Sequence, residues 1–363
     1  MVHLAIDEQI FAIQEYGGIS RLFAELAKQY SLNPTFGVEL EPLRAPIVNR
    51  YILDNPEVVR ALEVTTAPNS YRALAHYFTS RRPRVDVDVV HSTFYLPRGL
   101  SGYPGAKRVV TIHDMIPERM PKTRRRLDFI TRKQRYVELA DHVICVSAAT
   151  QADLMSTYGK IEGEVSVVHH GVDPIFKPGA ARWEDLPEKY VLFVGNRGQY
   201  KDANVLLRAF AEVASEFSDL VLLFVGGGRF TSAETQLIRQ LGIQERVRQR
   251  SLPDAEMSAA YGNAELCVFP SRFEGFGLPA LESMACGTPT VLASASSLPE
   301  VGGEGAVYFE PGHVNELTRV MRELLSDEQL RYELAARGLL RASQFSWEKS
   351  ARETAAVYDS LLN

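Results

Sequence analysis

Cysteine is scarce in this sequence. Three are present, Cys145, Cys267 and Cys286, each inside an apolar run and far from the other two. That number and spacing exclude a disulfide framework and match no zinc-binding motif. We therefore expect three buried thiols, the usual state of free cysteine, in a protein of the reducing cytosol.

Long apolar runs and an excess of positive charge are also absent. No stretch approaches the roughly 18–20 apolar residues that a membrane-spanning helix needs, and residues 1–6 lack the basic start and apolar core of a signal peptide. The formal net charge is −5, which argues against binding to nucleic acid through bulk charge. These absences predict a cytoplasmic protein without a nucleic-acid partner.

What the sequence does contain is a regular alternation of short apolar runs with amphipathic stretches, over 363 residues of ordinary globular composition. The predicted strands are Val2–Ile6, Val87–His91, Arg108–Ile112, His142–Val146, Val165–Val168, Tyr190–Val194, Leu220–Val225, Glu265–Phe269 and Thr290–Ala293. The predicted helices include Ile19–Tyr30, Leu127–Ala140, Val205–Phe217, Glu316–Leu325 and Trp347–Leu362. This alternation predicts a doubly wound α/β protein with parallel sheets.

The length exceeds what one hydrophobic core usually covers, so we expect two domains. Residues 173–189 are rich in proline and charge and separate two series of strands. We expect a first domain over residues 1–175 and a second over 176–346, each Rossmann-like. The last helix, 347–363, has an apolar stripe that must pack on something, and we expect it to complete the first domain.

The strongest motif is EGFGLPALE, which follows a predicted buried strand and starts a helix. Gly275 and Gly277 allow the backbone to turn tightly and to approach a ligand. A helix N-terminus after a parallel strand is a ready anion site. Glu274 and Glu282 place two carboxylates near the same crevice, where they can accept hydrogen bonds from sugar hydroxyls. The alternative is a helix cap and a solvated carboxylate.

A second motif, GNRGQYK, follows the first strand of the predicted second domain. Gly195 and Gly198 allow a tight loop. Arg197 and Lys201 supply positive charge, which suits a diphosphate because arginine binds phosphate in bidentate fashion and lysine acts as a point charge. A surface loop with two basic residues is the alternative.

Two segments of the predicted first domain also lie at strand ends, where site residues of such sheets gather. Gly17 and Gly18 form a glycine loop, and Ser20 is placed to cap or orient the helix that follows. His113 ends a buried strand and is a candidate site residue, with a structural histidine as the alternative. His91 ends another strand, and both interpretations stay open for it.

One stretch, residues 119–135, is strongly basic and amphipathic. Its basic residues are Arg119, Lys122, Arg124, Arg125, Arg126, Arg132, Lys133 and Arg135. In an acidic protein such a stretch suggests contact with anionic lipid or with a lipid-diphosphate acceptor. A solvated helix face is the alternative.

These motifs together resemble those of the retaining family-4 glycosyltransferases, which have the GT-B fold of two Rossmann-like domains facing a central cleft. The resemblance covers nearly the whole chain and is most specific over Tyr190–Pro311. It implies that Glu274 contacts the donor sugar near the reacting centre, that Glu282 binds the ribose, and that Arg197 and Lys201 bind the diphosphate. The remaining implied donor-site residues are Gly17, Gly18, Arg250, Leu252, Gly275, Phe276, Gly277 and Leu278, and His113 would lie near the sugar.

The resemblance also implies a reaction. Configuration at the anomeric carbon would be retained, with no cofactor and no obligatory metal, and no Asp-x-Asp motif lies near the proposed donor loop. The loops look most like those of bacterial mannosyltransferases of polysaccharide and O-antigen (lipopolysaccharide) assembly, which favours GDP-mannose as donor and a glycan or lipid-diphosphate-linked acceptor. If residues 119–135 contact anionic lipid, the cytoplasmic enzyme would lie peripherally on the inner face of the plasma membrane.

Several alternatives stay open. A UDP-sugar donor fits the same fold. A catalytically silent sugar-nucleotide-binding subunit of a glycan-assembly complex is a different class, although retention of all four charged site residues argues against it. An epimerase or a phosphorylase shares the fold, but a phosphorylase needs a pyridoxal lysine and a longer chain, and neither is evident.

Overall fold

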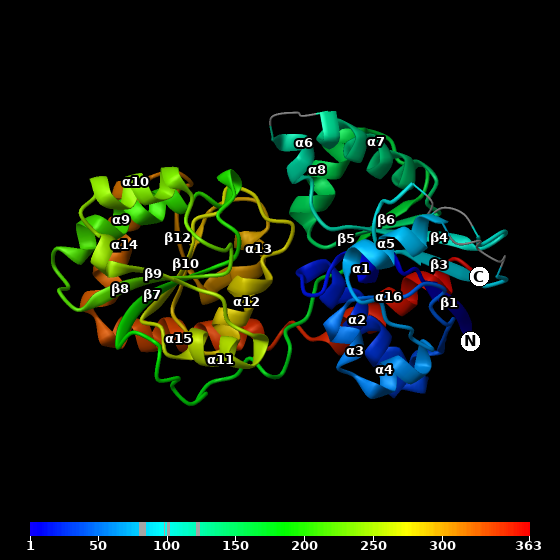
Figure 1. Cartoon of the computed structure of the whole chain (residues 1–363), viewed down its shortest axis with the longest axis horizontal. Helices are drawn as coiled ribbons and strands as arrows, with labels where there is room; N and C mark the ends of the chain where they lie inside the picture. Colours follow the sequence, from blue (N-terminus) through cyan, green and yellow to red (C-terminus); the bar gives the residue numbers. More distant parts are fainter. Residues whose placement is uncertain (80–84, 98, 100–101, 121–123) are drawn as a thin grey trace. The chain divides into compact units, whose positions relative to one another are not determined.

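The protein consists of two compact units, each with a parallel six-stranded sheet between helices (Figure 1). The computed structural model describes residues 1–79, 85–97, 99, 102–120 and 124–363. The first unit comprises Met1–Gly171 and Ser346–Asn363, and the second comprises Val172–Phe345. The predicted α/β architecture with two Rossmann-like sheets is confirmed.

The first unit has the strand order β2-β1-β3-β4-β5-β6, with every pair parallel. Its strands are β1 (Val2–Ile6), β2 (Val38–Leu40), β3 (Val89–Ser92), β4 (Lys107–Ile112), β5 (His142–Cys145) and β6 (Glu164–Val167). Its helices are α1 (Gln9–Ile13), α2 (Gly18–Leu32), η1 (Pro34–Phe36), α3 (Arg50–Leu53), α4 (Pro56–Ala61), α5 (Ser70–Thr79), α6 (Ile116–Arg119), α7 (Arg124–Glu138), α8 (Ala148–Tyr158) and α16 (Trp347–Ser360). The order reverses between β1 and β3, where ligands bind in open α/β sheets.

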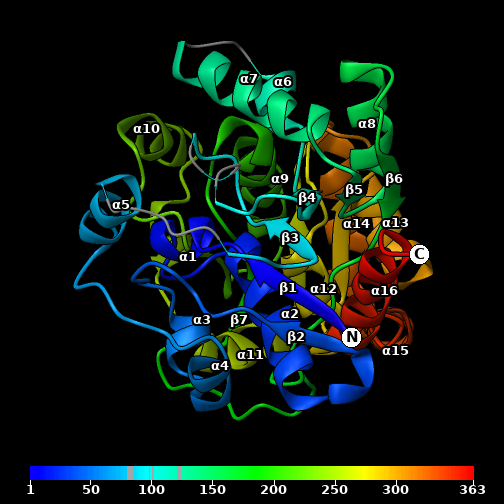
Figure 2. The same ribbon diagram turned by 90° about the vertical axis from the view of Figure 1, so that its right-hand side faces the viewer.

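Helix α16 packs on the first unit although it follows the whole second unit in sequence. Figures 1 and 2 show it, in red, against the blue helix α2. Tyr30 of α2 donates a hydrogen bond to the Ala351 carbonyl at 3.0 Å. Ala355 and Tyr358 are buried with Ala351, whereas Leu362, the last member of the predicted stripe, is exposed because the helix ends before it.

His91 shows why this packing is specific. Its Nδ1 lies 2.6 Å from the Tyr358 hydroxyl of α16, and its Nε2 lies 2.8 Å from the Thr111 hydroxyl of β4. Burial lowers the pKa of His91 to about 3, so the ring is neutral. Both ring nitrogens form hydrogen bonds inside the core, so this geometry fits a structural role for His91.

The second unit has the order β12-β11-β10-β7-β8-β9, again with every pair parallel. Its strands are β7 (Lys189–Val194), β8 (Leu220–Val225), β9 (Val247–Arg250), β10 (Leu266–Phe269), β11 (Thr290–Ala293) and β12 (Val307–Phe309). Its helices are η2 (Gln199–Lys201), α9 (Ala203–Ala214), α10 (Ser232–Gln240), η3 (Gln244–Arg246), α11 (Asp254–Gly262), α12 (Leu278–Ala285), α13 (Leu298–Gly302), η4 (Gly303–Gly305), α14 (Val314–Ser326) and α15 (Glu328–Ala342). Figure 1 shows α9, α10 and α14 on one side of this sheet and α11, α12 and α15 on the other.

The predicted cysteine environment is confirmed. Cys145, Cys267 and Cys286 are buried free thiols. Burial raises the pKa of the Cys145 and Cys286 thiols to about 12, which keeps them protonated and unreactive. Within the described residues, no helix is both long enough and apolar enough to span a bilayer.

Candidate active site

The main candidate site lies in the second unit, at the carboxyl edge of its sheet between β7 and β10. The strand order reverses there, so the loops that follow these two strands leave the sheet on either side of a crevice. The GNRGQYK loop follows β7, and the EGFG segment follows β10. Two motifs separated by more than seventy residues in sequence therefore meet at one edge of one sheet.

Their contact is an ion pair. Lys201 Nζ lies 2.5 Å from Glu274 Oε1, and each side chain is 12% exposed. Lysine therefore sits beside the carboxylate in a largely water-excluded place, where charges interact more strongly than they do in bulk water. An incoming phosphate would compete with Glu274 for this ammonium group.

Further contacts bind the two loops to each other. The backbone N–H of Arg272 donates to the Tyr200 carbonyl at 2.7 Å, and Arg272 Nε donates to Asp202 Oδ2 at 2.6 Å. The αL conformation of Asp202 (φ 47°), directly after Lys201, is rare for a residue with a side chain. Strain of this kind concentrates at functional sites. Neither Arg272 nor Asp202 was predicted, because only the folded loops bring them together.

Serines of the loop after β11 hold the backbone of the EGFG segment. Ser296 and Ser297 hydroxyls donate to the Glu274 carbonyl at 2.7 and 3.0 Å, and Ser297 also lies 2.8 Å from the Phe276 carbonyl. Ser296, like Asp202, has a left-handed backbone (φ 53°). The sequence signal that was missed is a pair of serines at the carboxyl end of a third neighbouring strand.

We expect Ser297→Ala to lower the turnover number up to about tenfold, because the variant loses the hydroxyl that bridges the Glu274 and Phe276 carbonyls, and about 1.4 kcal/mol corresponds to a factor of ten in rate. The affinity for nucleoside diphosphate should change little. Steady-state kinetics and calorimetry measure the two quantities. Ser343→Ala, which removes an exposed hydroxyl bonded to the Leu340 carbonyl, is the control, and equal losses in both variants would contradict the prediction.

Helix α12 presents its N-terminus at the same edge. Gly277 is its N-cap and needs a left-handed backbone (φ 108°) that favours glycine. One turn further in, Glu282 is almost completely buried and accepts a hydrogen bond from the Tyr261 hydroxyl at 2.9 Å. Burial raises the pKa of Tyr261 well above its usual value, so the hydroxyl stays protonated and donates. Glu282 is therefore oriented by α11 and is not a solvated surface carboxylate.

Arg197 is placed differently from Lys201. Its Nε donates to Glu234 at 2.8 Å, and its other nitrogens donate to the carbonyls of Gly226 and Gly228 at 3.1 and 2.9 Å. The side chain is 4% exposed and stacks over Phe230. In this structure Arg197 therefore fixes the glycine turn after β8, and the structure does not bring it to Lys201 and Glu274.

The two base-site candidates lie further along the same edge. Arg250 ends β9, the edge strand two places from β7, and its carbonyl accepts from the Gly226 N–H at 3.0 Å. Leu252 follows in the loop and is half-buried. A hollow of about 550 Å³ borders the β7 loop and is lined by polar residues that include Arg197, Asp202 and Arg208.

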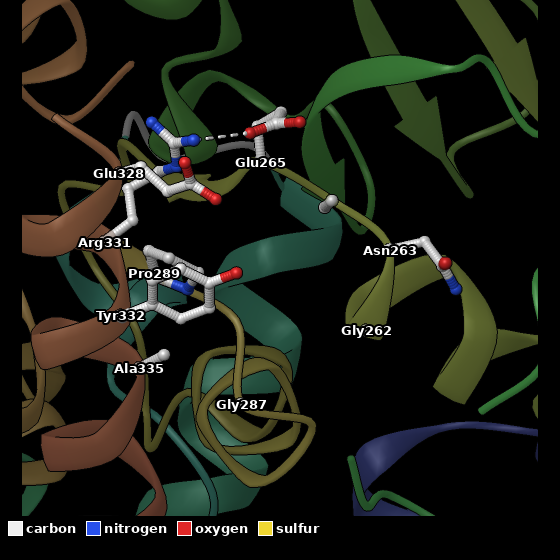
Figure 3. A pocket seen from close by; sticks show the side chains of 10 residues that line it. Gly262, Asn263, Glu265, Gly287, Pro289, Glu328, Arg331, Tyr332 and Ala335 are labelled. Atoms are coloured by element: carbon white, nitrogen blue, oxygen red, sulfur yellow. Dashed lines mark ion pairs between the residues drawn. The ribbon is translucent and has the colours of Figure 1, made fainter. Parts of the chain in front are cut away.

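A separate hollow of about 280 Å³ lies where β10 and β11 begin, at the opposite edge of the sheet from the two motifs (Figure 3). Tyr332 and Pro289 form one wall, and Arg331 pairs with Glu265 at 3.3 Å beside it. It contains none of the predicted site residues. This hollow therefore lies apart from the predicted site.

In the first unit, the candidates lie near the reversal between β1 and β3. Gly17 is the N-cap of α2, Gly18 begins it, and the Ser20 hydroxyl donates back to the Gly17 carbonyl at 3.1 Å. His113 follows β4 and is 8% exposed, with the Phe23 ring edge-on at 5.8 Å. Neither ring nitrogen of His113 makes a hydrogen bond of normal geometry to a described residue. Burial lowers the pKa of His113 to about 3, so the ring is neutral, and both of its nitrogens are buried.

The basic stretch of the first unit is only partly a surface feature. Lys122 lies outside the described residues, as do the side chains of residues 124–126. Arg135 and the apolar Leu127 are both exposed on α7, as expected of an amphipathic surface helix. The inclusion of Lys133 was wrong, because this side chain is buried in an ion pair with a glutamate.

Solved structures identify the class of fold that these two sheets form. Anabaena HepE in complex with UDP-glucose matches with a TM-score of 0.74 at 18% identity, over 99% of this chain and 100% of that one. Sucrose-phosphate synthase from Thermosynechococcus elongatus matches with a TM-score of 0.73 at 20% identity, over 100% and 99%. The two Rossmann-like units make up a GT-B fold, as predicted.

Sequence comparison gives the family. A family model described as "Glycosyltransferase Family 4" matches residues 16–176, and one described as "Glycosyl transferases group 1" matches residues 181–340. The MMP alpha-(1->4)-mannosyltransferase of Mycolicibacterium hassiacum is 32% identical, over 77% of this chain and 72% of its own length. The D-inositol 3-phosphate glycosyltransferase of Thermobifida fusca is 32% identical over 76% and 70%, and the O-antigen chain mannosyltransferase B of Escherichia coli is 28% identical over 74% and 73%. The chain belongs to the family-4 glycosyltransferases, as its motifs predicted.

Proposed function

We propose that this enzyme transfers a hexose from a nucleotide sugar to a glycan or lipid-linked acceptor, and that the hexose is mannose from GDP-mannose. The contact between Lys201 and Glu274 at the reversal point of the second sheet carries the proposal. It pairs a cation suited to a diphosphate with a carboxylate suited to sugar hydroxyls, at the edge where ligands of such sheets bind.

The proposed reaction retains configuration. The bond from the anomeric carbon to the diphosphate oxygen breaks, and the bond to the acceptor oxygen forms on the same face. The acceptor proton passes to the departing phosphate oxygen. Lys201 and the α12 N-terminus stabilise the charge of the leaving group, a preorganised arrangement that requires no metal. Glu274 orients the sugar and forms no covalent intermediate, and the neutral ring of His113 binds a sugar hydroxyl.

The choice of mannose rests on similarity. Two of the relatives described above are named as mannosyltransferases, and one of these names refers to an O-antigen chain. A UDP-sugar donor is the second candidate, because HepE binds UDP-glucose in its crystal structure.

A ligand screen tests the proposal. GDP, UDP, ADP and their common sugar conjugates are added without metal, and thermal shift and calorimetry measure binding. Stabilisation by GDP and GDP-mannose alone supports the mannose assignment, and a chelator should leave this binding unchanged. Stabilisation by UDP compounds would mean that the donor is a UDP-sugar, while the proposed reaction would stay the same. Nucleotide binding without sugar transfer favours a catalytically silent subunit, and absence of any nucleotide binding contradicts the proposal.

We also propose that α7 contacts an anionic membrane surface. The half-buried Arg132 and exposed Arg135 lie on one helix with the exposed apolar Leu127, and each basic residue near such a surface contributes about 1 kcal/mol. Arg132→Gln with Arg135→Gln should therefore weaken binding to phosphatidylserine vesicles roughly thirtyfold in co-sedimentation. Arg319→Gln with Arg352→Gln changes the net charge equally on other helices and is the control. Binding that ignores anionic lipid content would contradict the proposal.

A further inference from the structure

Lys133 stands apart from the other described residues of the basic stretch. It lies in α7, yet its side chain is 1% exposed. Its Nζ donates to the Asp114 carbonyl at 2.9 Å and to the Glu118 carboxylate at 3.0 Å. The Tyr158 hydroxyl of α8 donates to the same carboxylate at 2.8 Å. One buried ammonium group thus connects three helices to the chain segment after β4.

Stability alone does not account for this arrangement. Taking two charges out of water costs several kcal/mol per ion, and a well-packed apolar pair of similar volume is often as stabilising or more so. An apolar side chain, however, cannot hold a backbone carbonyl. The carbonyl that Lys133 holds belongs to Asp114, the residue directly after His113.

The segment is also fixed on the other side of His113. The Tyr95 hydroxyl donates to the Thr111 carbonyl at 2.8 Å, and the Tyr95 ring lies 6.5 Å from the His113 ring. Lys133 Nζ in turn lies 5.9 Å from the centre of the Tyr95 ring, within the range of a cation–π contact. Thr111 and Asp114 are therefore held at their carbonyls, and His113 lies between them.

We infer that Lys133 is a positioning residue that sets the orientation of His113 through the Asp114 carbonyl and the Tyr95 ring. The inference rests on the proposed function, since that proposal gives His113 its role at the sugar. The charge of Lys133 adds to burial in keeping the pKa of His113 low, so the ring stays neutral while it is oriented. Helix α7 would then have a buried side, on which Lys133 positions His113, and a solvent-facing side with Arg135, which we propose contacts the membrane.

The test replaces the ion pair of Lys133 and Glu118 by uncharged side chains of similar shape, a double variant called the neutral pair below. Lys133→Met with Glu118→Gln should lower kcat tenfold or more, as misplacement of a site group does, and leave KM for the donor within about twofold. Lys133→Arg keeps the charge but places its donors differently, so it should lose less activity than the neutral pair. Lys189→Met with Asp219→Asn neutralises an exposed ion pair at the start of β7 and is the control.

Action through His113 is tested by combining variants. If Lys133 works only by positioning that ring, adding the neutral pair to His113→Asn should cause no further loss of kcat, because the two changes share one effect. The inference would be overturned if the losses of kcat in the neutral pair and in His113→Asn multiply when the changes are combined. It would also be overturned if Lys133→Met with Glu118→Gln leaves kcat unchanged. If the pair fails to fold, Tyr158→Phe weakens the hold on Glu118 and should give a smaller loss that also vanishes in His113→Asn.

One readout is independent of catalysis. The His113 ring resonance, assigned by its loss in His113→Asn, should shift in the neutral pair and stay in place in the Lys189 and Asp219 control. A shift in a protein that transfers no sugar would uphold the positioning and reject the proposed function. An unshifted resonance would reject the positioning whatever the activity.

Discussion

A Lys201→Ala variant should bind nucleoside diphosphate at least tenfold more weakly, whereas Glu274→Ala should bind it as tightly as the parent or more so. In the proposed function Lys201 donates a charge-assisted hydrogen bond to phosphate, and such a bond contributes about 1.5–3 kcal/mol. Glu274 competes with the phosphate for the same ammonium group at 2.5 Å, so its removal frees the cation. Both variants should nevertheless lose transfer.

The expected losses of transfer are large. Removing one preorganised charge donor costs roughly 10²- to 10³-fold in turnover, and Glu274→Ala should abolish transfer because the sugar is no longer held. Calorimetry gives the affinities and single-turnover assays give the rates. Lys160→Ala, an exposed lysine of the first unit, is the control. Equal loss of nucleotide affinity in both site variants would contradict the idea that they compete.

A Gly171→Ala variant should lose about 3 kcal/mol of stability, the upper end of what overpacking a buried position costs. A β-carbon at residue 171 would lie 2.1 Å from the Trp347 backbone nitrogen and 2.4 Å from the Ser346 carbonyl carbon. Backbone atoms cannot rotate away, so the chain must shift. Buried Trp347 begins α16, and its displacement should loosen the helix from the first unit.

Chemical denaturation followed by tryptophan fluorescence measures this loss. Gly262→Ala is the matched control, because its β-carbon would meet no atom closer than the Cys286 carbonyl oxygen at 3.8 Å. That substitution should be neutral or slightly stabilising, since alanine costs less backbone entropy than glycine in a helix. Comparable stability in the two variants would contradict the prediction, because it would show that the backbone at Gly171 and Trp347 shifts at little cost in stability.

The sequence predicted the central strands well and the edges poorly. β1, β8 and β11 have the predicted bounds, because strands buried on both faces are continuous apolar runs. Of the four edge strands, β6 was predicted to within one residue, whereas β2, β9 and β12 were missed. They have only three or four residues and are partly exposed, so their pattern does not differ from that of a loop.

In the candidate site, the sequence predicted residue types but not the contacts between their side chains. Residue types at strand ends pointed to Glu274 and Lys201, yet nothing in the sequence indicated that they touch. Arg197 was predicted to act with Lys201 because it is basic and lies four residues before it in the sequence. The orientation of the Arg197 side chain, however, is set by a backbone carbonyl about thirty residues further along the chain. Lys133 was assigned to a charged surface because its burial depends on Glu118, which precedes the helix. Side-chain partners distant in sequence are set by the fold, and composition does not encode them.

The return of α16 to the first unit has a consequence for synthesis on the ribosome. Domains generally fold as they emerge, N-terminal first. Here the second unit is one continuous segment, Val172–Phe345, and its whole sequence is available before Ser346 is made. Until then Tyr30 and His91 lack their partners on α16. The first unit can therefore not complete its core until the whole second unit has been synthesised, so strict folding of one unit before the next is not open to this chain.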